Sequence, residues 1–229
     1  MKIGVTIQRL FLCAGLVASV GCGNGGSDDE ARVRVFHASP DAPNVDVLVD
    51  GGKVLENVPY TAASEFLPLD AGDHLLEVNV TGTDTTVIRA HTLLEKDQDY
   101  MVVAAGKVAS IGPIVVSVDR SNPEKGSARV RVLHSAASAP NVDVYVTAPG
   151  AGIGGAEPVL SNVPFKVMSD YLPVPAGAYD IAVTVAGTKN IAIRADGLEI
   201  ADGLVATVAA LDAPGGGAPF TLQVLDERK

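Results

Sequence analysis

The chain has 229 residues, a formal net charge of −10, and hydrophobic residues at 47% of its positions. Lysine and arginine do not gather into a basic patch, so we expect no nucleic-acid partner. Tryptophan is absent and aromatic residues make up 4% of the chain, which argues against a carbohydrate site built on exposed aromatic rings.

The first 22 residues have the features of a bacterial export signal. Lys2 and Arg9 supply positive charge, and an apolar stretch over 10–20 leads to Cys22. That stretch is shorter than the roughly 20 residues of a membrane span, so we expect a cleaved signal helix. The run SVGC at 19–22 resembles a lipobox, in which the cysteine becomes lipidated. The alternative is ordinary signal-peptidase cleavage near Gly21, which would release a soluble protein.

The residues after this signal predict a flexible tether. Positions 23–30 are rich in small residues and end in acidic ones. Cys13 lies inside the signal and Cys22 would carry lipid, so no cysteine remains for a disulfide or a thiolate metal site. Gly23 follows the cysteine, and similarity to enterobacterial lipoproteins then implies the outer membrane, on its periplasmic face or at the cell surface. We expect an exported protein, anchored in the cell envelope through Cys22.

The rest of the chain is a duplication. The run ARVRVFH at 31–37 returns as ARVRVLH at 128–134, and APNVDV at 42–47 returns at 139–144. A separation of roughly 100 residues is the size of a whole small domain. The sequence therefore predicts two tandem domains, 31–120 and 128–229, joined by a short polar linker over 121–127.

Both copies have the pattern of β-strands. Val33, Val35 and His37 alternate with polar or aromatic neighbours, and Gly, Asp and Pro turns separate several such segments. Spacing of this kind predicts an all-β fold of two immunoglobulin-like antiparallel β-sandwich domains with about seven strands each. A small β-barrel is the second choice, and no βαβ pattern supports a parallel sheet. The short linker suggests that the two domains sit end to end.

Three repeated segments carry a family resemblance. These are the RVRV start with its HASPDAP turn, the NVPY and NVPF segments, and the SEFL and SDYL segments. Together they resemble the bacterial domain-of-unknown-function 4397 family over nearly the whole chain after the tether. The resemblance implies exported, surface-associated modules, often in tandem, without an established activity. The second copy departs at 136–138, where AAS replaces the SPD of 39–41.

Polar residues recur around the first turn of each copy. A histidine, an asparagine and an aspartate at these places could hold a metal ion, since calcium takes six to eight oxygen ligands. Asx side chains also bond their own turns, and a histidine at a strand end can bond a turn carbonyl, which we favour. The candidate binding residues are His37, Asp41, Asn44, Asp46, His134, Asn141 and Asp143.

The two copies differ at one connection. Residues 147–161 of the second copy replace the shorter 50–56 of the first. We expect a tolerated, mobile loop, although loops of this kind also carry function.

No catalytic motif is recognisable. The sequence has no Gly-x-Ser-x-Gly elbow, no His-Glu-x-x-His pair and no phosphate-binding glycine loop before a helix, so we expect no enzyme, cofactor or metal. The favoured function is a non-enzymatic envelope lipoprotein that contacts a protein or an envelope polymer. One alternative is a calcium- or zinc-binding or hydrolytic domain using His37, Asp41 and Asp46. Another is a glycan-binding module.

Overall fold

The computed structural model describes residues 29–229; the predicted signal peptide, Cys22 and most of the predicted tether lie outside them. The first repeat contains eight strands and a short 3-10 helix: β1 (Glu30–Ala38), β2 (Val45–Val49), β3 (Gly52–Val58), β4 (Leu67–Asp70), β5 (Gly72–Val80), β6 (Thr86–Leu94), β7 (Asp99–Ala105), η1 (Val108–Ser110) and β8 (Gly112–Val118). The second repeat contains eight more: β9 (Ser127–His134), β10 (Val142–Thr147), β11 (Leu160–Val163), β12 (Leu172–Pro175), β13 (Gly177–Val185), β14 (Ile191–Ile200), β15 (Val205–Leu211) and β16 (Thr221–Asp226).

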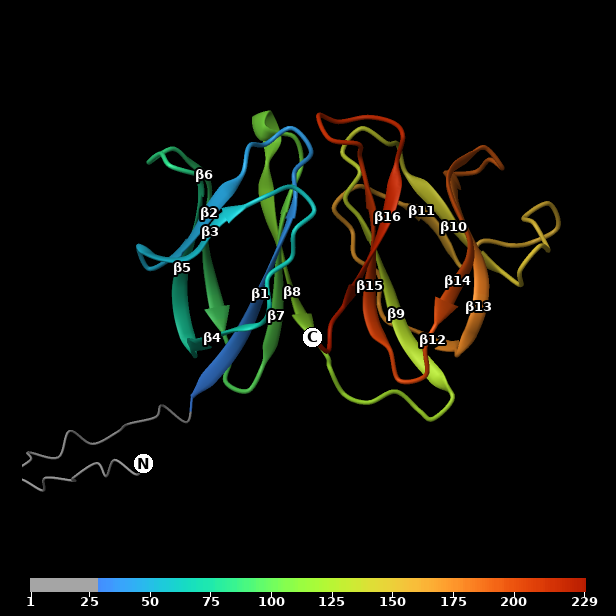
Figure 1. Ribbon diagram of the computed structural model, residues 1–229, viewed down its shortest axis with the longest axis horizontal. Helices are drawn as coiled ribbons and strands as arrows, with labels where there is room; N and C mark the ends of the chain where they lie inside the picture. The colour runs from blue at the N-terminus through green and yellow to red at the C-terminus, as the bar shows by residue number, and fades with distance from the viewer. Residues whose placement is uncertain (1–28) are drawn as a thin grey trace, which may run out of the picture.

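Each repeat is a sandwich of two four-stranded sheets, which confirms the predicted fold class (Figure 1). The inner sheets have the strand orders β4-β1-β7-β8 and β12-β9-β15-β16, and the outer sheets β3-β2-β5-β6 and β11-β10-β13-β14. All pairs are antiparallel except one in each inner sheet, where β1 runs parallel to β7 and β9 to β15. Each sandwich has eight strands, against the expected seven or so.

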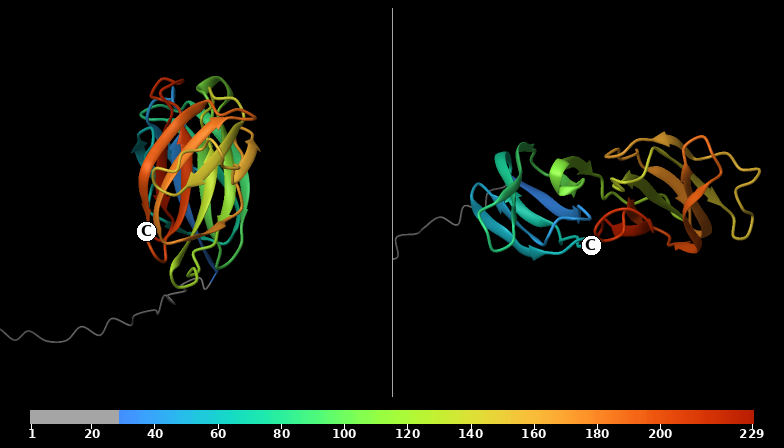
Figure 2. Two further views of the ribbon diagram at one scale, coloured as in Figure 1. Left: turned by 90° about the vertical axis from the view of Figure 1, so that its right-hand side faces the viewer. Right: turned by 90° about the horizontal axis from the view of Figure 1, so that it is seen from above.

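The two repeats lie side by side with their inner sheets face to face (Figures 1 and 2). The expected end-to-end arrangement is therefore wrong. One apolar cluster draws its members from both inner sheets, and its buried residues are Phe36, Ala38, Met101, Val103, Ala105, Val118, Leu133, Ala209, Leu211 and Leu225. The residues between the end of β8 at Val118 and the start of β9 at Ser127 are enough for the chain to reverse and place the second repeat beside the first.

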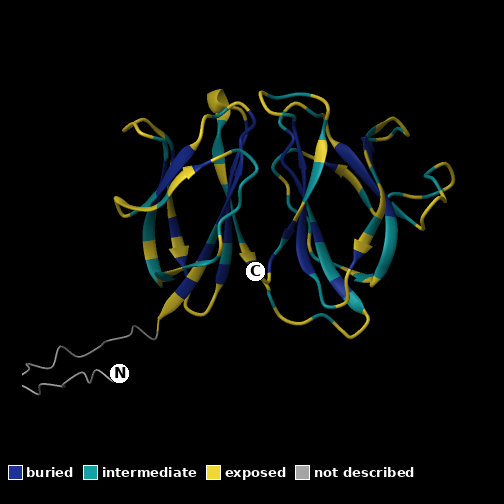
Figure 3. Ribbon diagram, in the orientation of Figure 1, coloured by how far each residue is buried: buried dark blue, intermediate teal, exposed yellow. Residues whose placement is uncertain are grey.

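This contact explains why the central strands β7 and β15 of the inner sheets are buried on both faces. In β1, Val33 and Val35 point into the sandwich core, while Phe36 joins the cluster between the repeats. Strands β7 and β15 are buried along almost their whole length, and Figure 3 shows long dark-blue stretches in the inner sheets. The molecule thus has four β layers with three apolar seams between them.

Matching hydrogen bonds relate the two halves by an approximate two-fold axis. The Nη1 of Arg34 donates to the backbone oxygen of Asp226 at 2.6 Å, and the Nη1 of Arg131 donates to that of Ser117 at 3.0 Å. Ser117 and Asp226 occupy corresponding positions in β8 and β16. Each repeat therefore gives the same arginine to the same strand of the other, as in an isologous dimer.

The surroundings of these two arginines differ. Arg131 is buried, and the Nη2 of its guanidinium lies 2.6 Å from the Oε1 of Glu227. The Cζ of the same guanidinium lies 4.6 Å from the ring centroid of Tyr171. The hydroxyls of Thr207 and Tyr171 both donate to the same Glu227 carboxylate. At the corresponding places the first repeat has only the apolar side chains of Met101, Val118 and Phe66.

We expect Phe36→Ala to lower the free energy of unfolding by about 3–5 kcal/mol, because removal of the large ring creates a cavity in the close-packed cluster between the repeats. Since the seam is shared, unfolding in urea should stay a single transition for both repeats. Val224→Ala, at an exposed position of β16, should change stability by less than about 0.5 kcal/mol. Two separate transitions, one of them unmoved by Phe36→Ala, would contradict a shared core.

Glu227→Ala should cost about 3–5 kcal/mol of unfolding free energy, because it leaves the buried guanidinium of Arg131 without its counter-charge. The matched control is Asp196→Ala, which breaks the exposed Arg194–Asp196 pair and should cost about 0–1 kcal/mol. If denaturant titrations gave the same loss of unfolding free energy for both variants, the buried Arg131–Glu227 pair would contribute no more to stability than the exposed Arg194–Asp196 pair.

Candidate functional site

The two repeated histidines form hydrogen bonds that stabilise the turn after the first strand of each repeat. His37 and His134 are fully buried, and their Nε2 atoms lie 3.3 Å and 3.0 Å from the backbone oxygens of Pro43 and Pro140. A carbonyl only accepts, so each Nε2 carries a hydrogen; the Nδ1 of His37 accepts from the backbone N–H of Ser39 at 3.3 Å, so this ring is neutral. Each ring also meets an aromatic edge, Tyr60 or Phe165, at a centroid distance of 6.1 Å. These contacts fix the turn after the first strand.

The repeated aspartates hold the neighbouring turns. Asp46 accepts from the backbone N–H of Asn57 at 2.9 Å and from the Thr81 hydroxyl at 2.9 Å. Lys53, 2.7 Å from the other oxygen, and the Asn57 N–H lower the pKa of Asp46 to about 2. Asp46 is therefore ionised, buried and fully occupied.

The second copy repeats this arrangement. Asp143 accepts from the N–H groups of Asn162 at 2.7 Å and Gly187 at 2.8 Å. Asn162, like Asn57 of the first copy, has a positive φ, and Asn141 donates to its side chain at 2.9 Å, as Asn44 does to that of Asn57. Asx side chains thus stabilise a left-handed residue that a β-bulge requires.

The remaining candidate does not complete a metal site. Asp41 is exposed and accepts from the N–H of Val108 at 2.8 Å, away from the partners of His37 and Asp46. Within residues 29–229, no group of three or more His, Cys, Asp or Glu side chains could hold a metal ion. His37, Asp41 and Asp46 each bind a different part of the backbone, so the structure does not join them in one site.

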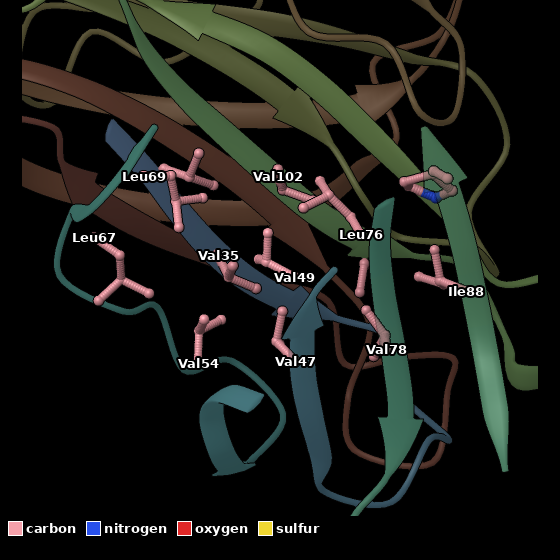
Figure 4. A pocket seen from close by; sticks show the side chains of 14 residues that line it. Val35, Val47, Val49, Val54, Leu67, Leu69, Leu76, Val78, Ile88 and Val102 are labelled. Atoms are coloured by element: carbon pink, nitrogen blue, oxygen red, sulfur yellow. The ribbon is translucent and has the colours of Figure 1, made fainter. Parts of the chain in front are cut away.

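Each sandwich has an apolar cleft at its open side, between the edges of the inner and outer sheets. In the first repeat, Val54, Leu67 and Leu69 line the rim and Val35, Val47 and Leu76 are among the residues of the floor (Figure 4). The second repeat places Val159, Leu172 and Val174 at the corresponding rim. The clefts measure about 20 and 50 Å³, far below the roughly 300 Å³ of a small-molecule pocket, so they are the open ends of the cores.

A polar groove that the sequence analysis did not identify lies on the outer face of the first repeat. We call it the outer groove; it has a volume of about 220 Å³ and is lined by Asp46, Leu48, Lys53, Asn79, Gly82, Thr83 and Asp84. Only Asp46 among these was a candidate. The sequence does contain a signal for this groove: the turn TGTDT at 81–85 corresponds to AGTKN at 186–190, so that Asp84 of the first copy is replaced by Lys189 in the second.

The loop at 147–161 is held against the second repeat. The N–H of Gly150 donates to Asp180 at 2.8 Å, and Lys189 donates to the backbone oxygens of Ile153 at 3.0 Å and Ala156 at 2.7 Å. The backbone bonds of Asp180 to Gly150 and Gly197 lower the pKa of its carboxyl group. The loop expected to be mobile is therefore tied down at several points.

Fold and site together define a tandem β-sandwich protein whose repeated polar residues brace turns. The described residues contain no helix long and apolar enough to cross a membrane. The domain of unknown function DUF4397 matches residues 31–145 and 152–229, so the chain belongs to this family. This confirms the family resemblance found in the sequence; the lipoprotein signal lies outside the matched residues.

Among solved structures, the chain is similar to a family 26 carbohydrate-binding module of Eubacterium rectale Amy13K in complex with maltoheptaose, at 11% identity over 84% of this chain and 96% of that one, with a TM-score of 0.28. A candidate cell adhesion protein of Bacteroides uniformis matches at 11% identity over 86% and 99%, with a TM-score of 0.26. The comparison with curated proteins gives no match.

The buried histidines predict a loss of stability in mild acid. Burial lowers the pKa of His37 and of His134 despite their carbonyl bonds, so the unfolded chain binds more protons. Stability should be complete above about pH 6.5 and decline as the pH falls toward the lowered pKa values. The measurement is urea unfolding at pH 7.5, 6.5 and 5.5.

Two variants check the assignment. The double variant His37→Gln and His134→Gln should flatten this decline, whatever its stability at pH 7.5. For His74, burial lowers the pKa, but bonds to Asp50 and to the Asp70 carbonyl raise it by more, so this histidine stabilises the fold below its pKa. His74→Gln should steepen the decline. An unchanged slope in the double variant would contradict the role of the buried pair.

Proposed function

We propose that this protein is a non-enzymatic lipoprotein of the bacterial cell envelope, anchored at the outer membrane through Cys22, that binds another protein or an envelope polymer. The main support is that the polar residues repeated in both copies make hydrogen bonds to their own turns. His37, Asp46 and their counterparts His134 and Asp143 are consumed by bonds to their own turns. The residues with the strongest case for chemistry thus serve the architecture.

The arrangement of the sheets supports a binding role. The shared apolar cluster fixes the two sandwiches as one body, and the outer sheets face in opposite directions (Figure 1). Rigid scaffolds of this kind commonly present loops and sheet faces to partners. The first strand begins at Glu30, the last residue of the predicted tether, so a lipid at Cys22 would hold this body close to the membrane.

Anchoring can be tested in cells that express the full chain. Wild-type protein should sediment with envelope membranes, and Cys22→Ala should abolish lipid labelling and either release the protein or leave it unprocessed. Cys13→Ala, the other cysteine of the predicted signal, should leave labelling and sedimentation unchanged. If Cys22→Ala fractionates and labels like the wild type, the anchor is not at this residue.

A further inference from the structure

The outer groove of the first repeat lies over β2, β3 and the turn between β5 and β6. Its floor is formed by Leu48 and Asn79, both half-buried and facing away from the sandwich core. The Oδ1 of Asn79 is shielded from solvent yet has no hydrogen-bond partner. Asp84 stands on the turn at one end of the groove.

The charges of the groove are unevenly matched. The Nζ of Lys53 lies 2.7 Å from Asp46 and 3.1 Å from Glu56, so its single charge already serves two carboxylates. Asp84 has no hydrogen bond or ion pair within the described part of the chain. The groove therefore has an excess of negative charge, with Asp84 as the unpaired member, and it favours a cation.

The second repeat shows the same face with charge of the opposite sign. Register places Tyr145 where the first repeat has Leu48, and the turns place Lys189 where it has Asp84. The Nζ of Lys189 lies 4.3 Å from the ring centroid of Tyr145, so it reaches across the sheet face. The lysine thus lies over its own sheet and contacts Tyr145, whereas Asp84 has no partner among the described residues.

The chain itself covers this face in the second repeat. The inserted loop crosses the outer sheet, as the left view of Figure 2 shows, and its Gly152 and Ile153 line a small pocket together with Thr147, Ala182 and Arg194 of that sheet. Two loop carbonyls accept hydrogen bonds from Lys189. Tyr145, whose ring lies under the Lys189 ammonium, is only 3% exposed.

The second repeat shows which kind of segment fits on this face of the outer sheet. In the second repeat the occupant is a peptide rich in glycine and alanine, and the charged turn residue holds it. The first repeat has no inserted loop, its counterpart face is open, and its turn residue is a carboxylate. Residues 29–229 leave this face uncovered, so we assign the equivalent occupant to another chain, which would supply the cation.

We infer that the outer groove of the first repeat binds an extended peptide segment of another protein, rich in small residues, through a lysine or arginine that pairs with Asp84. This inference rests on the proposed binding function and narrows it to one face and one class of partner. The backbone of the segment would lie beside Asp84, as the inserted loop lies beside Lys189 in the second repeat.

The test uses the purified full-length protein and two synthetic peptides. Both have the sequence of residues 148–156, one with Gly154→Lys and one with Gly154→Glu, a position where a side chain meets no neighbour within 4 Å in the folded loop. Binding is measured by NMR titration. The lysine peptide should bind at least about fivefold more tightly and shift the resonances of Leu48, Asn79 and Gly82.

Charge reversal makes the test specific. Asp84→Lys should weaken binding of the lysine peptide by about fivefold or more and should restore binding of the glutamate peptide. Asp170→Lys makes the same change at an exposed position in the second repeat and should alter neither. Thermal melting checks that each variant is folded. Equal binding of the two peptides, or no effect of Asp84→Lys, overturns the inference.

These outcomes are distinct from failure of the proposed function. If the peptides bind as expected but Cys22→Ala has no effect, only the anchor is wrong. If neither peptide binds but cross-linking in intact cells captures a partner at another surface, the binding function stands and the assignment to this groove fails.

Discussion

The architecture depends on the apolar contact between the two inner sheets. It buries Phe36, Leu133 and Leu211 completely or nearly so, and it belongs to neither repeat alone. Each sandwich by itself would expose this apolar face to water, and a contiguous exposed apolar patch on a soluble domain calls for a partner. The second copy is that partner, joined covalently. The duplication is therefore a structural requirement as well as a record of how the chain arose.

The approximate two-fold axis also shows where the copies have diverged. Arg34 and Arg131 cross the same seam, but only Arg131 has a buried counter-charge, Glu227. A buried pair costs desolvation energy, which bonds from the two nearby hydroxyls offset by satisfying the carboxylate. Among the bonds that cross the seam are those from Arg34 and Arg131 to the backbone oxygens of Asp226 and Ser117, and a sliding sheet would break them. These two arginines thus add register to a seam whose apolar residues supply cohesion.

The sequence predicts the parts of the fold that depend on local pattern. Strand alternation and turn residues predict two sandwiches, and Asx turn chemistry accounts for Asn44 and Asp46. The packing of the repeats is not local. Alternation around Val33 and Val35 indicates one buried face and leaves open whether the other meets water or protein. The continuous apolar runs in β7 and β15 carried that information, since a strand buried on both faces has no reason to alternate.

The candidate site was harder to predict for a related reason. Repetition draws attention to His37 and His134, yet what both copies retain is what the shared fold needs. The groove appears only when one asks where the copies disagree: Asp84 against Lys189, and a short connection against a long one. Each difference is readable in the sequence, but their coincidence on one sheet face is a tertiary fact. A body with one outer face closed by its own chain and the other open has two unequal surfaces, and the open one is where binding specificity can have evolved without disturbing the fold.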